Sequence, residues 1–140
     1  MKEWGLIADS SCDLNDTLFD AGDLYFATVP LKILVDGREF IALPETDPRN
    51  MLRAVRESKG PSSTACPSPA DFAAQLRQAK NSFVVTISSH LSGTYNAALQ
   101  AMQLVHDEAP DHHIHVVDSL STAGSMVLIL RRLREATQET

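Results

Sequence analysis

The segment that most constrains the fold is a short apolar run at residues 83–87, followed by a hydroxyl-rich loop and an apolar-faced helix. The run Phe83-Val84-Val85-Thr86-Ile87 is aromatic and β-branched, which is typical of a buried parallel strand. Beyond the loop at residues 88–94, apolar residues recur at helical spacing from Ala97 to Val105. A strand, a loop and a helix in this order predict one unit of a layered α/β domain.

The same alternation of short β runs and helical faces extends along the chain. We expect strands at residues 4–8, 28–35, 38–41, 83–87 and 114–117, with a hairpin at Asp36-Gly37. We expect helices at residues 15–21, after Asp47-Pro48 with Met51, Leu52 and Val55 on its buried face, after Ser68-Pro69, after the 88–94 loop, and from about residue 122. The predicted fold class is an α/β layered domain whose mainly parallel sheet is flanked by helices.

Composition and charge narrow the class of protein. A chain of 140 residues with 44% hydrophobic and 21% charged residues suits one globular domain with its own core. The net charge of −6, with Lys and Arg scattered rather than banded, argues against nucleic-acid binding. The longest apolar run, residues 126–130, is too short to span a membrane. Two cysteines without a secretory signal are typical of free thiols, so we expect a cytoplasmic protein.

Serine-bearing loops follow three of the predicted strands, after residues 8, 87 and 117. Because parallel strands bind ligands outside their carboxyl ends, we expect these hydroxyls to gather at one edge of the sheet. Hydroxyls beside a helix N-terminus, where the helix dipole is positive, suit an anionic head group. The alternative for Ser92 or Thr94 is that the side chain only caps the following helix.

Five segments carry a family resemblance, in order along the chain: residues 7–14 (IADSSCDL), 29–31 with 35–37 (VPL and VDG), 63–72 (STACPSPADF), 91–95 (LSGTY) and 116–119 (VVDS). Together they resemble the DegV family of bacterial fatty-acid-binding proteins, which includes the fatty-acid-carrying subunits of fatty acid kinase. The likeness spans essentially all 140 residues. It matches only the first domain of the family, so we expect one N-terminal-type domain at residues 1–140, without the family's second domain.

The resemblance implies a lipid-binding carrier and assigns roles to individual positions. Thr64 and Ser92 match the residues that hold the carboxylate of a long-chain fatty acid. The resemblance implies no catalytic residue, no cofactor other than the bound fatty acid, and presentation of the carboxylate to a separate fatty acid kinase subunit. This chain departs from the family pattern at Ala65-Cys66, where Ser-Gln is usual, and at Leu120, where a basic residue is common. The supporting residues expected around the site are Gly93, Thr94, Ser10, Ser11 and Ser119.

Two other functions and a metal site remain as alternatives. An acyl hydrolase would use Ser92 or Cys12, but a Gly-x-Ser-x-Gly motif needs glycines where His90 and Thr94 stand. A truncated interaction module would bind no ligand at all. The tract His112-His113-x-His115 lacks a further ligand at the usual spacing, so we expect a solvated turn and no metal.

The last predicted helix contains Met126-Val127-Leu128-Ile129-Leu130, which is apolar on every side for more than one turn. A helix on the surface of a lone domain needs only one apolar stripe. We therefore expect a homodimer that forms through the C-terminal helix, near residues 123–133.

Overall fold

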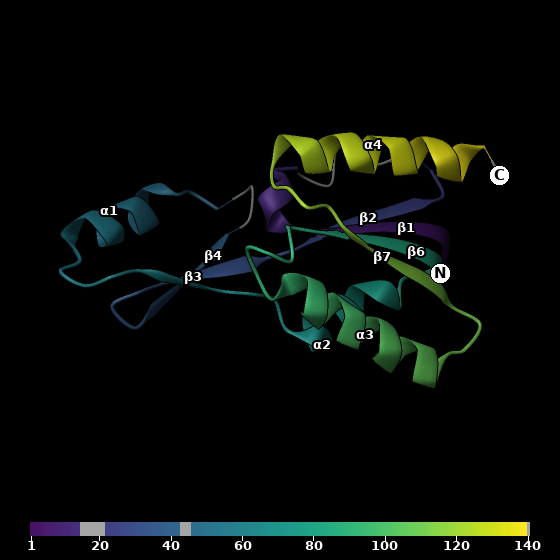
Figure 1. Cartoon of the computed structure of the whole chain (residues 1–140), viewed down its shortest axis with the longest axis horizontal. Coiled ribbons are helices and arrows are strands. Elements are labelled where there is room, and N and C mark those ends of the chain that lie inside the picture. Colours follow the sequence, from purple (N-terminus) through teal and green to yellow (C-terminus); the bar gives the residue numbers. More distant parts are fainter. Residues whose placement is uncertain (15–21, 43–45, 140) are drawn as a thin grey trace.

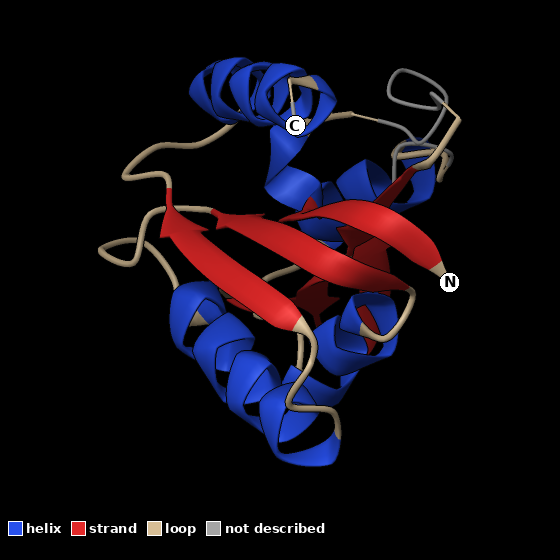
Figure 2. Cartoon of the chain, turned by 90° about the vertical axis from the view of Figure 1, so that its right-hand side faces the viewer, coloured by secondary structure: helices blue, strands red, loops and turns tan. Residues whose placement is uncertain are grey.

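The computed structural model describes residues 1–14, 22–42 and 46–139 of the chain. Its centre is a four-stranded parallel sheet in the order β2-β1-β6-β7, formed by β1 (Lys2–Asp9), β2 (Leu24–Val29), β6 (Ala79–Thr86) and β7 (His113–Asp118). Helices α2 (Pro69–Leu76) and α3 (Thr94–Glu108) cover one face of this sheet, and α4 (Gly124–Gln138) covers the other (Figures 1 and 2). The predicted α/β class with a parallel sheet between helices is confirmed.

The two faces of the sheet bury two separate apolar clusters, because side chains alternate along each strand. Ile7 and Val84 point toward α2 and α3, where they pack with Phe72 and other apolar residues. Leu6 and Val85 point toward α4 and join its buried residues in the second cluster. The predicted start of α2 is also confirmed, since Ser68 and Asp71 form a reciprocal capping box with Pro69 in the first turn.

A second, three-stranded antiparallel sheet extends from one end of the parallel sheet (Figure 1). It has the order β4-β3-β5 and consists of β3 (Leu31–Val35), β4 (Arg38–Ala42) and β5 (Ser63–Ala65). The prediction of one strand over residues 28–35 is wrong, because the chain leaves the parallel sheet at Pro30 and enters the second sheet. Proline has no N–H to continue the ladder, so it stands where the pairing changes. The Asp36-Gly37 hairpin is confirmed.

Helix α1 (Arg49–Glu57) lies beside the second sheet, and its predicted buried face is wrong. Leu52 is 52% exposed and Val55 is 39% exposed, while Met51 is half-buried. Periodicity identified the apolar residues, but α1 rests on a small sheet, which covers one side of it. Asp47 is not the N-cap residue, although its carboxylate accepts a hydrogen bond from the Arg49 N–H at 3.0 Å.

Helix α4 is largely covered by the parallel sheet, so less apolar surface is left for a dimer than the run predicts. Met126 and Leu130 are fully buried, and Val127 and Ile129 pack against the same cluster. Leu128 is the exposed member of this run, at 66%. Within the described residues, no helix has the length and apolar character needed to cross a lipid bilayer. The helix predicted at residues 15–21 lies outside the described residues.

Candidate functional site

The loops that follow β6 and β7 are bonded together at the carboxyl edge of the parallel sheet. The Ser88 N–H donates to the Ser121 carbonyl at 2.9 Å, and the Ser119 N–H donates to the Thr86 carbonyl at 3.2 Å. The carboxylate of Asp118 accepts from the Ser89 N–H at 3.1 Å. The strand ends and their serine-bearing loops therefore form one continuous edge, as the parallel topology predicts.

Asp9 is the central polar residue of this edge, although it is not among the residues that the sequence predicts for the site. Its side chain is fully buried, accepts from the Ile87 N–H at 2.6 Å and the Ser11 N–H at 2.9 Å, and also accepts from the Ser11 hydroxyl. Burial raises the pKa of Asp9, and the three hydrogen bonds offset only part of that rise. Asp9 thus joins the end of β1 to the end of β6 and to the short helix η1 (Ser10–Cys12).

The hydroxyls of Ser10 and Ser11 have partners inside the protein. The Ser10 hydroxyl accepts from the Leu31 N–H at 2.9 Å, which ties η1 to the start of β3. The Ser11 carbonyl accepts from the Ala123 N–H at 3.0 Å, which ties η1 to the segment before α4. Cys12, the last residue of η1, is buried, and burial raises the pKa of its thiol to about 11.

Ser92 and Gly93 lie in the loop before α3, and Thr94 is the first residue of the helix. The hydroxyls of Ser92 and Thr94 are 2.8 Å apart, and the Ser92 hydroxyl also accepts from the Thr94 N–H at 3.3 Å. Gly93 is the N-cap residue, so neither hydroxyl fills the N-cap position, although Ser92 accepts the first N–H of the helix. Among the described residues, no acceptor takes the N–H groups of Tyr95 and Asn96. The start of α3 therefore presents unpaired donors beside two hydroxyls.

Thr64 lies in β5, where it is exposed and stands opposite Ile33 of β3. Two residues later, the exposed Cys66 approaches the loop before α3: a Cβ built on Gly93 would stand 3.7 Å from the Cys66 sulfur. The segment that carries Thr64 and the loop that carries Ser92 are therefore neighbours, although about 30 residues separate them in the sequence.

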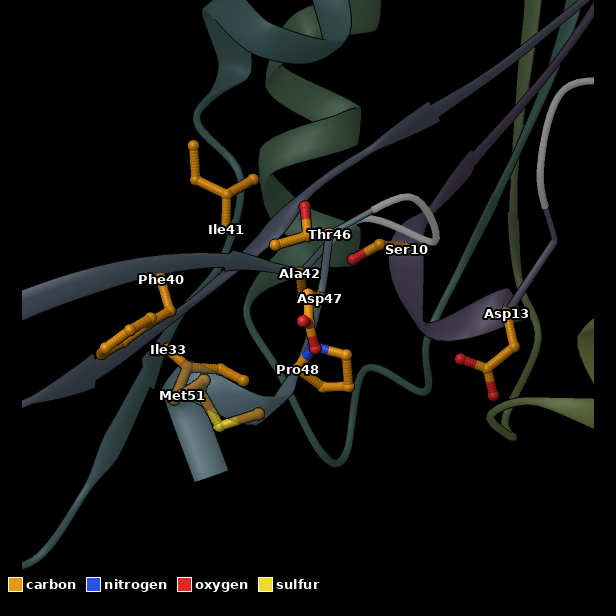
Figure 3. A pocket seen from close by; sticks show the side chains of 10 residues that line it. All are labelled: Ser10, Asp13, Ile33, Phe40, Ile41, Ala42, Thr46, Asp47, Pro48 and Met51. Carbon is orange, nitrogen blue, oxygen red and sulfur yellow. The ribbon is translucent and has the colours of Figure 1, made fainter. Parts of the chain in front are cut away.

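A cavity of about 380 Å³ opens between the second sheet, the start of α1 and η1. Phe40, Ile33 and Met51 gather at one end of it, and Ser10 and Asp13 lie at the other (Figure 3). Its lining residues are Ser10, Asp13, Ile33, Phe40, Ile41, Ala42, Thr46, Asp47, Pro48 and Met51. Ser10 is the one predicted site residue in this set.

Thr64 belongs to the same face of the second sheet as part of the cavity wall. Residues paired directly across an antiparallel ladder share a face, and Ile33 pairs with both Phe40 and Thr64. The row Phe40–Ile33–Thr64 therefore runs from an apolar wall of the cavity to a hydroxyl at the edge of the sheet. The alternation of apolar residues in the 31–42 hairpin is the sequence signal that could have identified this wall.

The side chain of Ser119 is bonded within its own loop, and the histidine tract lies at the opposite end of β7. The Ser119 hydroxyl donates to the Ser121 carbonyl at 3.1 Å and accepts from the Ser121 N–H, which closes a turn around Leu120, a residue with φ of 51°. His113 is exposed, but His112 is buried, so the expectation of a fully solvated turn is wrong for His112. The described residues contain no cluster of three His, Cys, Asp or Glu side chains placed to hold a metal.

Several known proteins resemble this chain in both sequence and fold. A DegV domain-containing protein of Streptococcus pneumoniae is 37% identical over 132 residues, which cover 94% of this chain and 47% of that protein. The fatty acid kinase (Fak) B3 protein of the same species, solved with linoleic acid, matches 98% of this chain and 49% of that one, with a TM-score of 0.93 and 36% identity. A DegV family protein from Eubacterium eligens, solved with heptadecanoic acid, matches 97% of this chain and 48% of that one, with a TM-score of 0.88 and 35% identity.

This chain spans about half the length of these relatives. The family model described as "Uncharacterised protein, DegV family" matches residues 3–139, almost the whole sequence. The chain therefore belongs to the DegV family.

Proposed function

We propose that this protein binds a long-chain fatty acid, with the carboxylate at Thr64 and Ser92 and the tail along the apolar wall of the second sheet. The observation that carries this proposal is that two structures loaded with fatty acid match 97% or more of the chain at TM-scores of 0.88 and 0.93. No cofactor is part of the proposal, because the fatty acid itself is the ligand.

The geometry is compatible with a carboxylate at the loop before α3. Hydrogen bonds to a charged acceptor contribute about 1.5–3 kcal/mol each, and this loop offers two hydroxyls next to unpaired N–H groups. The supporting roles fall to Gly93 and Thr94 in the loop and to Ser10 and Ser11, which hold η1 in position. Ser119 supports its own turn.

An acyl tail needs an apolar surface of suitable size. Each buried methylene contributes about 0.8 kcal/mol, so the tail supplies most of the affinity. The cavity of about 380 Å³ is within the size range of small-molecule sites. In this proposal the tail extends from Thr64 past Ile33 to Phe40 and Met51.

We further propose that the chain acts as a carrier, not as an enzyme, and presents the carboxylate to a separate kinase subunit in the cytoplasm. Ser92 is bonded to Thr94, with no histidine as its partner among the described residues. The neutral, buried Cys12 thiol is a poor nucleophile near neutral pH, because the reactive form is the thiolate. Failure to turn over a generic ester therefore distinguishes the proposed carrier from an acyl hydrolase.

The test is a titration with a fluorescent fatty acid. Thr64→Ala and Ser92→Ala should each weaken binding by about 1–2 kcal/mol, because each leaves a carboxylate oxygen without a donor. Cys66→Ser, on the same exposed segment as Thr64, is the matched control and should bind like the parent. If both alanine variants fold normally and bind with parental affinity, the assignment of the carboxylate to these residues is wrong.

A further inference from the structure

Helix α1 lies at the end of the molecule that is farthest from α3 and α4 (Figure 1). Arg49, Arg53 and Arg56 are spaced by four and three residues, so they share one side of the helix. Leu52 and Val55 form an adjoining apolar strip, and they are 52% and 39% exposed. Met51 lines the cavity on the opposite flank. The helix therefore combines an arginine side with an exposed apolar strip.

Most of the positive charge on this helix is not neutralised within the described residues. Arg49 is paired with Asp47 at 2.9 Å, but no ion pair joins Arg53, Arg56 or the nearby Lys59 to an acidic residue described in the structure. Glu57 is the acidic residue of α1 itself.

The part of the chain around this helix is more positive than the rest. Residues 31–65 contain six of the twelve Lys and Arg and five of the eighteen Asp and Glu, a net charge of +1. The rest of the chain, with six basic and thirteen acidic residues, has a net charge of −7. Near a negatively charged surface, this asymmetry turns the α1 end toward the surface and the remainder away from it.

We propose that α1 docks on an anionic lipid bilayer, with Leu52 and Val55 entering the interface and the arginines among the head groups. A short amphipathic helix with basic residues beside an apolar strip is suited to this shallow position. A stable protein interface buries about 800 Å² on each partner, far more than two side chains supply, which favours a bilayer over an acidic protein as the occupant. The proposal concerns docking alone and does not depend on fatty-acid binding.

Co-sedimentation of the 140-residue chain with vesicles tests this proposal. The chain should bind vesicles of phosphatidylglycerol and phosphatidylcholine in equal parts, should bind pure phosphatidylcholine weakly, and should dissociate at high salt. Arg53→Gln/Arg56→Gln should lower the partition coefficient by about tenfold, and Leu52→Ser should also lower it. The matched controls, Arg131→Gln/Arg132→Gln on α4 and Leu104→Ser on α3, remove the same charge and a similarly exposed leucine and should have little effect.

A fluorescence measurement separates docking from a folding defect. In a Trp4→Phe background, the tryptophan introduced by Leu52→Trp should shift its emission to the blue on anionic vesicles and be quenched by brominated lipid, whereas the tryptophan introduced by Leu104→Trp should not. The proposal is overturned if the parent chain fails to sediment with anionic vesicles, if the control variants lose as much binding as the α1 variants, or if the side chain at position 52 stays in water. If the parent chain does not bind vesicles, an acidic protein becomes the better candidate partner for the arginine side of α1.

Discussion

At the scale of single residues, Asp9 supports more of the candidate site than any predicted hydroxyl. Its buried carboxylate accepts hydrogen bonds from the ends of two segments, at Ser11 and Ile87. Through Ser11 it also fixes the position of Ala123, just before α4. Asp9 is therefore a positioning residue, whose contacts set the arrangement of the loops around the candidate site.

Replacing Asp9 should destabilise the protein. In Asp9→Ala the part-buried N–H groups of Ser11 and Ile87 lose their acceptor, at a cost of about 1–3 kcal/mol each, offset in part by removal of a buried charge. Urea denaturation should show a net loss of about 2 kcal/mol in the free energy of unfolding. Asp23→Ala, at an exposed aspartate, should change it little. Equal stability of the two variants would contradict the role of Asp9.

The comparison of wild type with Asp9→Ala should also depend on pH. Because the pKa of Asp9 is raised above its ordinary value of 3.8, the folded protein keeps this proton at pH values where the unfolded chain has lost it. The contribution of Asp9 to stability therefore falls as pH rises from 3.8 through the raised pKa. The stability difference between wild type and Asp9→Ala should narrow over that interval, and a gap that widens would contradict the burial of this carboxylate.

Short sequence motifs point to candidate binding residues, but not to the buried residues that hold the loops in place or to the apolar wall. Thr64 and Ser92 are assigned through the short motifs of the family resemblance, and their contact with a carboxylate stays a prediction. The role of Asp9 does not follow, since its importance comes from burial and from donors 78 residues away at Ile87. Phe40 and Met51 become part of a wall only when the hairpin and α1 meet.

At the scale of elements, local patterns predict which residues are apolar but not what covers them. The α4 run is apolar all round and is nevertheless mostly covered, because the parallel sheet lies beneath it. The α1 pattern predicts a buried face, yet Leu52 and Val55 remain exposed beside the small second sheet. The parallel sheet follows from alternating strands and helices. The antiparallel sheet does not, because β5 is only three residues long and Pro30 divides one apolar run between two sheets.

The hairpin of the second sheet depends on its turn residues. Gly37 has φ of 77°, a conformation that costs a residue with a Cβ about 1–2 kcal/mol. Gly37→Ala should therefore lower the free energy of unfolding by about 1 kcal/mol. Gly60→Ala is the matched control, since Gly60 lacks a positive φ and has open space around it, and should be neutral or slightly stabilising. Thermal unfolding of both variants measures the difference, and an unaffected Gly37→Ala would rule out this turn geometry.

At the scale of the whole molecule, the packing of α4 limits which of its residues could form the homodimer that the sequence predicts. We propose that any contact between two copies through α4 centres on Leu128, since Leu130 is fully buried. Light scattering at micromolar concentrations should find self-association in the parent and less of it in Leu128→Glu. Leu104→Glu, at an exposed leucine of α3, is the control. A parent chain that stays monomeric throughout would contradict dimerisation through this helix.

The whole molecule joins a rigid parallel sheet, which presents hydroxyls and N–H groups at its edge, to a smaller sheet that contributes an apolar wall. In the proposed site the carboxylate lies between Ser92, at the edge of the parallel sheet, and Thr64 of the second sheet, and the tail lies along the second sheet, so the proposal needs both sheets. Native mass spectrometry of the freshly purified chain tests this most directly. A bound mass that matches a long-chain fatty acid, and that is reduced in Thr64→Ala and Ser92→Ala, is the predicted result. A chain that carries no such mass, and takes up none when incubated with oleic or palmitic acid, would contradict the proposal.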